Sequence, residues 1–123
     1  MKVVWIGVAG FAGALSRYAL SGWVADRSKG AFPWGTFVVN VAGCFALGLV
    51  FALLTERYLP HPTVRAALTI GFLGAYTTFS TFAFETMRLI DNGAVLLAGL
   101  NVLGSVAAGI TAVYIGTWLG RAL

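Results

Sequence analysis

Charged residues are scarce in this chain. Only 10% of its 123 residues are Asp, Glu, Lys or Arg, whereas 59% are hydrophobic. A soluble domain usually carries about 25% charged residues. A soluble fold of this length could not bury so much apolar surface, and the excess would aggregate. The composition therefore argues against an ordinary soluble domain and predicts a protein embedded in a lipid bilayer.

Cysteine, histidine and clustered basic residues are also lacking. Cys44 is the only cysteine and His61 the only histidine, so neither an intrachain disulfide nor a Cys/His metal cluster is expected. The 8 Lys and Arg residues form no run of the kind that binds nucleic acid. We interpret them as anchors that flank the membrane. No nucleophile–base pair or set of metal ligands is recognisable, so we do not predict an enzyme. Because the basic residues are scattered, we do not predict a nucleic-acid partner either.

Long hydrophobic stretches are what the chain does contain. A membrane-spanning helix needs about 20 mostly apolar residues. Four stretches meet this requirement, at residues 3–25, 33–54, 64–87 and 94–119. They predict an all-α membrane protein with four transmembrane helices in a single domain over residues 1–123. An even number of spans would place both termini on the same side.

Basic residues are divided evenly between the two predicted sides. Cytoplasmic loops normally carry an excess of Lys and Arg. The side of the termini would carry Lys2, Arg57, Arg65 and Arg121, and the opposite side Arg17, Arg27, Lys29 and Arg88. A chain without a charge bias can insert both ways and pair with its inverted copy, although other details could set the orientation. Four short helices also make a poor pore alone, so we expect a dual-topology, antiparallel homodimer.

Small residues recur at helical spacing in the first and last stretches. Such residues let helix backbones approach closely in lipid. They are Gly7, Gly10 and Gly13 in the first stretch, and Gly99, Gly104 and Ala108 in the last. We expect helix–helix packing at these positions. The first set is not a dinucleotide-binding fingerprint, because no strand precedes it.

The third stretch contains a group of hydroxyl residues near its middle. These are Thr77, Thr78, Ser80 and Thr81, and they follow Gly71 and Gly74. One Ser or Thr can bond back to its own helix backbone, but this density beside two glycines predicts a helix that breaks inside the membrane. The carbonyl groups freed at such a break suit a small hard cation.

Two aromatic residues lie within and directly after this set of hydroxyl residues, at a helical spacing. Phe79 and Phe82 are three positions apart, so they share one face of a helix. Packing against lipid or the protein core is the common interpretation of such a pair. The alternative is contact with an anion, because the edge of an aromatic ring is positive. Ring edges attract an anion weakly, and conduction needs entry without trapping.

Polar residues also occur in the first two stretches. Asn40 lies midway along the second, one turn after Thr36, and its amide could join two helices or donate to a dehydrated anion. Arg17 could extend to the membrane surface or raise the anion concentration at a pore mouth. Glu85 and Arg88 are spaced for an ion pair on one helix, which is our preferred interpretation of Glu85.

Four motifs are distributed along the chain. The third stretch reads GFLGAYTTFSTF from Gly71 to Phe82, and the others are GALSRY at 13–18, WGTFVVNVAGCFALG at 34–48 and NVLGS at 101–105. Together they resemble the Fluc (also called CrcB) family of fluoride channels. The resemblance covers nearly the whole chain.

The resemblance implies a fluoride-selective passive channel, with two pores in an antiparallel homodimer. It implies that Asn40, Phe79 and Phe82 line each pore and that Arg17 lies near a vestibule. Further pore residues would be Thr36, Ser80, Thr81 and Ser105. The backbone carbonyls of Gly74 and Thr77 from both chains would hold a structural sodium ion on the twofold axis.

A passive channel would be sufficient to export fluoride. Neutral hydrogen fluoride crosses a bilayer and ionises in the cytoplasm, where the anion is trapped. An inside-negative potential favours exit across the cell (inner) membrane by about 2.3 kcal/mol per 100 mV. The main rival function is a small multidrug-type, proton-coupled transporter, which needs a carboxylate deep in a span. The first span contains no Asp or Glu, and the only candidate, Glu85, lies near a helix end. A purely structural scaffold would leave Asn40, Phe79 and Phe82 unexplained.

Overall fold

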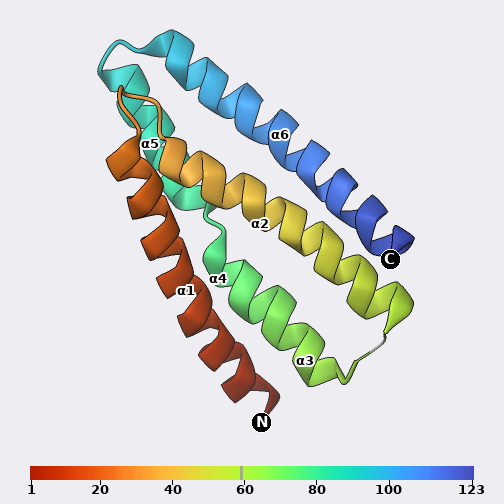
Figure 1. Ribbon diagram of the computed structural model, residues 1–123. Helices are drawn as coiled ribbons and strands as arrows, with labels where there is room; N and C mark the ends of the chain where they lie inside the picture. The colour runs from red at the N-terminus through yellow and green to blue at the C-terminus, as the bar shows by residue number, and fades with distance from the viewer. Residues whose placement is uncertain (59) are drawn as a thin grey trace.

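The computed structural model describes residues 1–58 and 60–123, which are helical over most of their length (Figure 1). Two of the segments, η1 and η2, are π-helical. The elements in chain order are α1 (Lys2–Arg27), α2 (Trp34–Ala52), η1 (Leu53–Arg57), α3 (Pro62–Ala66), η2 (Ala67–Leu73), α4 (Gly74–Tyr76), α5 (Phe79–Asp91) and α6 (Val95–Ala122).

Four helical units are long and apolar enough to cross a membrane. They run over Lys2–Arg27, Trp34–Arg57, Pro62–Asp91 and Val95–Ala122. The second unit joins α2 to η1, and the third joins α3, η2, α4 and α5. The predicted all-α architecture with four spans is thus confirmed, and each unit reaches beyond the predicted stretch at its carboxyl end.

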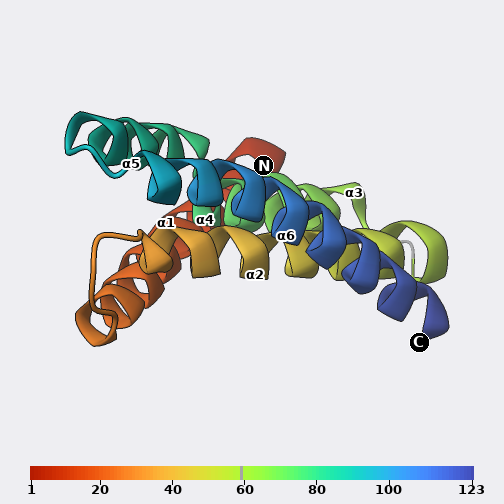
Figure 2. The same cartoon turned by 90° about the horizontal axis from the view of Figure 1, so that it is seen from above.

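The second span lies at the centre of the molecule. α2 packs along α6 on one side and against α1 on the other, while α1 also packs along η2 and α4. Figures 1 and 2 show α5 leaving the end of α4 in a different direction, beside the start of α6. Both termini lie toward the same end of the bundle in Figure 1, as an even number of spans requires.

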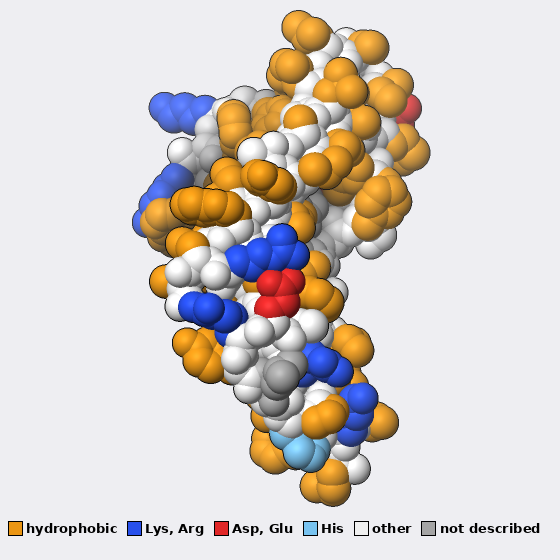
Figure 3. All heavy atoms as spheres, turned by 90° about the vertical axis from the view of Figure 1, so that its right-hand side faces the viewer, with side chains coloured by type: hydrophobic (Ala, Val, Ile, Leu, Met, Phe, Trp, Pro, Cys, Tyr) orange, Lys and Arg blue, Asp and Glu red, His pale blue; other side chains and the backbone are white. Residues whose placement is uncertain are grey.

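Charged side chains lie mostly near the ends of the helical spans, on both sides of the bundle. On the face shown in Figure 3, Lys, Arg and acidic side chains run from the middle to the lower part, further Lys and Arg side chains lie at the upper left edge, and the upper right part is mostly hydrophobic. Arg121 near the end of α6 pairs with Glu56 in η1, with 2.9 Å between Nε and Oε2. Both side chains are exposed, so this ion pair adds little stability. The charge distribution fits a helix end at a membrane surface.

Glycines allow two close helix contacts. Gly13 of α1 lies against the Phe72 carbonyl of η2, and Gly116 of α6 lies against the Phe45 carbonyl of α2. A Cβ atom at either glycine would overlap with that carbonyl, so only glycine permits the approach. Close packing was therefore correctly predicted at Gly13.

The small-residue prediction does not hold for several other positions within one protomer. A Cβ atom at Gly7, Gly99 or Gly104 would meet no described atom within 4 Å. Spacing identified a face of small residues on each helix but did not identify which helix, if any, packs on that face.

The third span is interrupted as predicted. α4 ends at Tyr76, and Thr77 (φ −84°, ψ 156°) and Thr78 (φ −148°, ψ 119°) have extended backbones. α5 then begins at Phe79, with the Thr78 hydroxyl oxygen accepting from the Thr81 N–H as an N-cap at 3.4 Å. The break therefore creates a new helix start inside the span.

Candidate functional site

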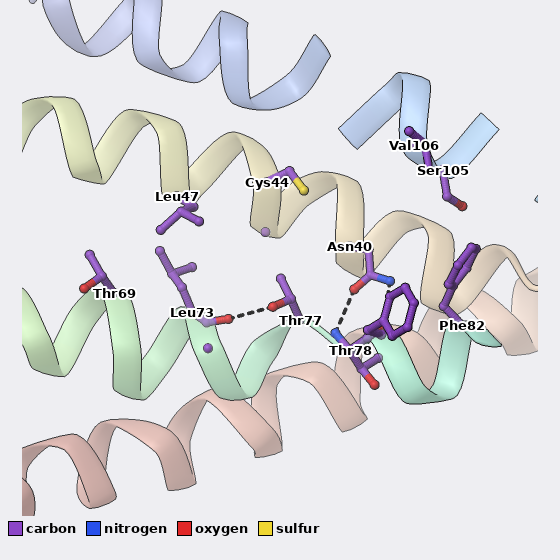
Figure 4. Close-up of a pocket in the computed structure, with 13 residues that line it drawn as sticks. Asn40, Cys44, Leu47, Thr69, Leu73, Thr77, Thr78, Phe82, Ser105 and Val106 are labelled. Atoms are coloured by element: carbon purple, nitrogen blue, oxygen red, sulfur yellow. Dashed lines mark hydrogen bonds between the residues drawn. The ribbon is translucent and has the colours of Figure 1, made fainter. Parts of the chain in front are cut away.

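Asn40 of α2 holds the break in the third span. Its Oδ1 accepts a hydrogen bond from the Thr78 N–H at 2.8 Å, and its Nδ2 donates to the Thr78 carbonyl at 2.9 Å (Figure 4). The Asn40 amide thus replaces the helical partners that Thr78 lacks. Gly43, one turn later, lets the break approach α2, because a Cβ atom there would overlap with the Thr77 side chain.

The break also releases two carbonyl groups from regular helical bonding. In a continuous helix the Thr78 N–H would donate to the Gly74 carbonyl, but here it donates to Asn40. The Thr81 N–H would likewise donate to the Thr77 carbonyl, but it donates to the Thr78 hydroxyl. These are the two carbonyls for which the family resemblance implies a sodium ion. Backbone carbonyl oxygens are ligands that a hard cation accepts, so the donor chemistry fits.

A cavity of about 340 Å³ lies beside the break, and we call it the main cavity because most of the predicted site residues line it. Its lining includes six of the predicted site residues, which are Asn40, Gly74, Thr77, Phe79, Phe82 and Ser105. In Figure 4, Phe82 of α5 and Ser105 of α6 lie at one end of the cavity and Asn40 lies between them and Thr77. The structure therefore brings together residues from three helices that are distant in sequence.

The two phenylalanines differ in exposure. Their ring centroids are 5.7 Å apart, with an angle of 48° between the ring planes. Phe79 is 79% exposed and Phe82 is half-buried. Neither ring is enclosed within the protomer, so both are available to a partner or an ion.

Arg17 lines a second, smaller cavity. It measures about 220 Å³, and its lining includes Arg17, Thr36, Thr78 and Thr81. Arg17 Nε is buried and has no hydrogen-bond partner within residues 1–58 and 60–123. Thr78 also lines the larger cavity, so the two cavities are neighbours. A guanidinium group in this place makes the small cavity favourable for an anion.

Glu85 does not form the predicted ion pair with Arg88. Instead its Oε1 accepts a hydrogen bond from the Thr36 hydroxyl at 2.6 Å, which joins α5 to α2. Glu85 lines two further cavities, one with Thr36 and Thr81 and the other with Arg88. The ion-pair interpretation was wrong because it considered one helix alone, whereas Glu85 faces α2.

The structure also separates some predicted residues. Thr36 and Thr81 lie with Arg17 rather than with the phenylalanines. Ser80 is exposed on α5 and is not among the residues that line the four cavities described above. Sequence reasoning did not include Thr78 or Glu85 among the candidate pore residues. The signal for Glu85 was its spacing, four positions after Thr81 and three after Phe82, which places all three near one face.

Comparison with known proteins identifies the family of this chain. A model of the family described as "CrcB-like protein, Camphor Resistance (CrcB)" matches residues 4–117. A protein of Solibacter usitatus named "Fluoride-specific ion channel FluC" is 50% identical over 121 residues, covering 98% of this chain and 99% of the relative. Relatives with the same name occur in Geotalea daltonii (49% identity; 98% and 94% covered) and Nitratidesulfovibrio vulgaris (43%; 98% and 97%).

The match is long enough to decide family membership. The family model extends over all four spans, and the identity to these relatives runs through nearly the whole of each chain. The spans are those of a multi-pass membrane protein. On these grounds the chain belongs to the CrcB family.

Proposed function

We propose that this chain forms a fluoride-selective, passive ion channel that exports cytoplasmic fluoride and so reduces its toxicity. The observation that carries the proposal is one cavity that unites Asn40, Phe79, Phe82 and Ser105, in a chain about half identical to relatives named as fluoride-specific ion channels. Such channels are not enzymes, and an inner-membrane location would give fluoride export its driving force.

The chemistry of the main cavity suits a mobile anion. No charged side chain is among its lining residues, so an ion there would not be held by a full opposite charge. Asn40 uses one amide hydrogen on Thr78, and its second amide hydrogen is available to an anion. Ring edges add a weak attraction. The balance of entry and release that conduction requires is met by such contacts.

The first test compares ions in reconstituted liposomes. We expect fluoride efflux that is rapid, driven by the membrane potential and independent of a proton gradient, with chloride efflux close to that of protein-free liposomes. Fluoride costs more to dehydrate than chloride does. Selectivity for fluoride therefore depends on uncharged hydrogen-bond donors in the pore that offset this cost. Equal chloride flux would reject a fluoride channel. Flux that requires a proton gradient would favour the transporter alternative, with Glu85 as the coupling carboxylate.

We further propose an antiparallel homodimer with two pores. Three features support it: Phe79 and Gly74 are exposed in the protomer, the main cavity is open, and Gly104 borders open space. Freed backbone carbonyls facing lipid would be costly, so a second copy is a better neighbour than hydrocarbon. The even division of basic residues allows that copy to be inverted.

Topology is the second prediction. A tag at the C-terminus should be accessible from both sides of the membrane in intact cells, in similar amounts, because the charge distribution favours neither orientation. Labelling with a membrane-impermeant reagent before and after permeabilisation measures the two fractions. Labelling from one side only would reject the inverted pair.

Sodium dependence is the third prediction. If Gly74 and Thr77 of two copies supply four carbonyl oxygens to one structural sodium ion, sodium removal should weaken the dimer and lower fluoride flux. The Thr77 hydroxyl donates to the Leu73 carbonyl at 3.1 Å, so it is not needed as a ligand. Thr77→Ala should therefore behave like the wild type in sodium. Dimer elution and flux that are unaltered in sodium-free, ion-stripped buffer would contradict a structural ion.

A further inference from the structure

Helix α5 carries both phenylalanines but is poorly anchored by apolar contacts. Leu89 is its only buried residue, and Phe79, Phe84 and Met87 are exposed. Within one protomer, the orientation of α5 therefore depends largely on its polar contacts with other helices. Asn40 holds its start through Thr78, and Thr36 reaches Glu85 at its middle. A third contact, from α6, is more deeply buried than either.

That third contact is a chain of hydrogen bonds centred on Asn101. Asn101 of α6 is 1% exposed. Its Nδ2 donates to the Thr86 hydroxyl oxygen at 2.9 Å, and the Thr86 hydroxyl donates to the Phe82 carbonyl at 2.8 Å. On the other side, the Ser105 hydroxyl donates to Asn101 Oδ1 at 3.3 Å. One buried amide thus connects Phe82 and Ser105, which lie at the same end of the main cavity (Figure 4).

We propose that Asn101 is a positioning residue for the anion path, acting through Thr86 on Phe82 and directly on Ser105. Thr86 has a single hydroxyl hydrogen. The donation from Asn101 occupies the hydroxyl oxygen and leaves this hydrogen for the Phe82 carbonyl. The same amide accepts the single hydroxyl hydrogen of Ser105, so it also sets the direction of that hydroxyl. Asn101 itself does not line the main cavity, and its effect is indirect. The inference rests on the proposed fluoride channel.

The decisive variants alter the hydroxyl of Thr86 without altering its size. Thr86→Val removes the hydroxyl, so the hydrogen bond from Asn101 that joins α6 to α5 is lost. We expect fluoride flux per assembled dimer to fall about tenfold, which corresponds to about 1.4 kcal/mol in barrier height, with reduced fluoride-to-chloride selectivity. Thr86→Ser keeps the hydroxyl and should retain wild-type flux. Equal loss in both variants would overturn the role of the hydroxyl.

A double variant separates positioning from stability. Thr86→Val leaves the Asn101 amide buried without its partner, whereas Thr86→Val with Asn101→Leu removes both polar groups and restores an apolar contact. A purely structural role predicts that the double variant regains dimer stability and conducts like the wild type. A positioning role predicts that it regains stability but stays about tenfold slower. If the double variant does not assemble, the comparison of Thr86→Val with Thr86→Ser decides.

Thr111→Val is the matched control. The Thr111 hydroxyl donates to the Ala107 carbonyl at 2.7 Å, the same bond within a helix that Thr86 makes, but on an exposed face of α6. Fluoride flux through the Thr111→Val variant should equal that of the wild type. A wild-type protein that does not conduct fluoride overturns the proposed function and this inference with it. A conducting wild type with an equally conducting double variant overturns the inference alone.

Discussion

Phe82→Ile should lower fluoride flux through each assembled dimer by up to about 30-fold. Isoleucine retains apolar bulk but lacks the ring quadrupole whose positive edge attracts an anion. A desolvated cation over the face of an aromatic ring gains about 2 kcal/mol from the same quadrupole. If this value is the upper bound for an anion at the ring edge, its loss at the barrier gives the stated factor. The ring belongs to the cavity that contains Asn40 and Ser105. Fluoride efflux from liposomes, normalised to dimer elution, measures the change.

Two comparisons show whether the ring itself matters. Phe82→Tyr keeps an aromatic ring and should reduce flux less than Phe82→Ile, unless the added hydroxyl blocks the path. Phe84→Ile makes the same exchange at an exposed position of α5 that is not among the cavity residues, and it should conduct normally. A phenylalanine that only packs the protein would give the reverse result, with a destabilised dimer that conducts normally once assembled.

Asn40→Asp should abolish measurable fluoride flux. The ionised carboxylate accepts but cannot donate, so it loses the bond to the Thr78 carbonyl and the free donor in the cavity, and it repels an anion. A hydrogen bond to a charged group contributes about 1.5–3 kcal/mol, equivalent to about 10- to 150-fold in rate, before repulsion is added. Flux near neutral pH, with dimer elution as the control, tests this expectation.

Acidification separates the two roles of Asn40. A protonated aspartate can accept from the Thr78 N–H and donate to the Thr78 carbonyl, as Asn40 does now. The break would then be held again, but the second amide hydrogen would still be missing. At a pH low enough to protonate the introduced carboxyl group, persistent loss of flux would assign the effect to this hydrogen, and recovery would assign it to the charge. Protein-free liposomes at the same pH measure the leak of neutral hydrogen fluoride, which is subtracted. Wild-type flux in assembled Asn40→Asp dimers at neutral pH would remove Asn40 from the path.

The Glu85 contact changes how the polar residues are grouped. Thr36 and Glu85 are hydrogen-bonded to each other and line one cavity. That cavity shares Thr36 and Thr81 with the cavity of Arg17, which in turn shares Thr78 with the cavity that contains Asn40. Sequence spacing predicted that Thr36 and Asn40 share one face of α2, and both do bond to residues of the interrupted third span. It could not show that Glu85 turns toward α2 instead of toward Arg88.

Sequence alone determined the features that depend on a single helix and its solvent. Hydrocarbon cannot form hydrogen bonds with backbone N–H and C=O groups, so a segment that crosses it must be helical here. The length and composition of the apolar stretches therefore specify the four spans. Clustered hydroxyl residues beside Gly74 predicted a break in the third span, which the structure places at Thr77 and Thr78. Tertiary structure decided which polar groups meet, as shown by Asn40 with Thr78, Thr36 with Glu85, and Asn101 with Thr86. These partners lie on different helices, and spacing within one helix does not encode how two helices pack.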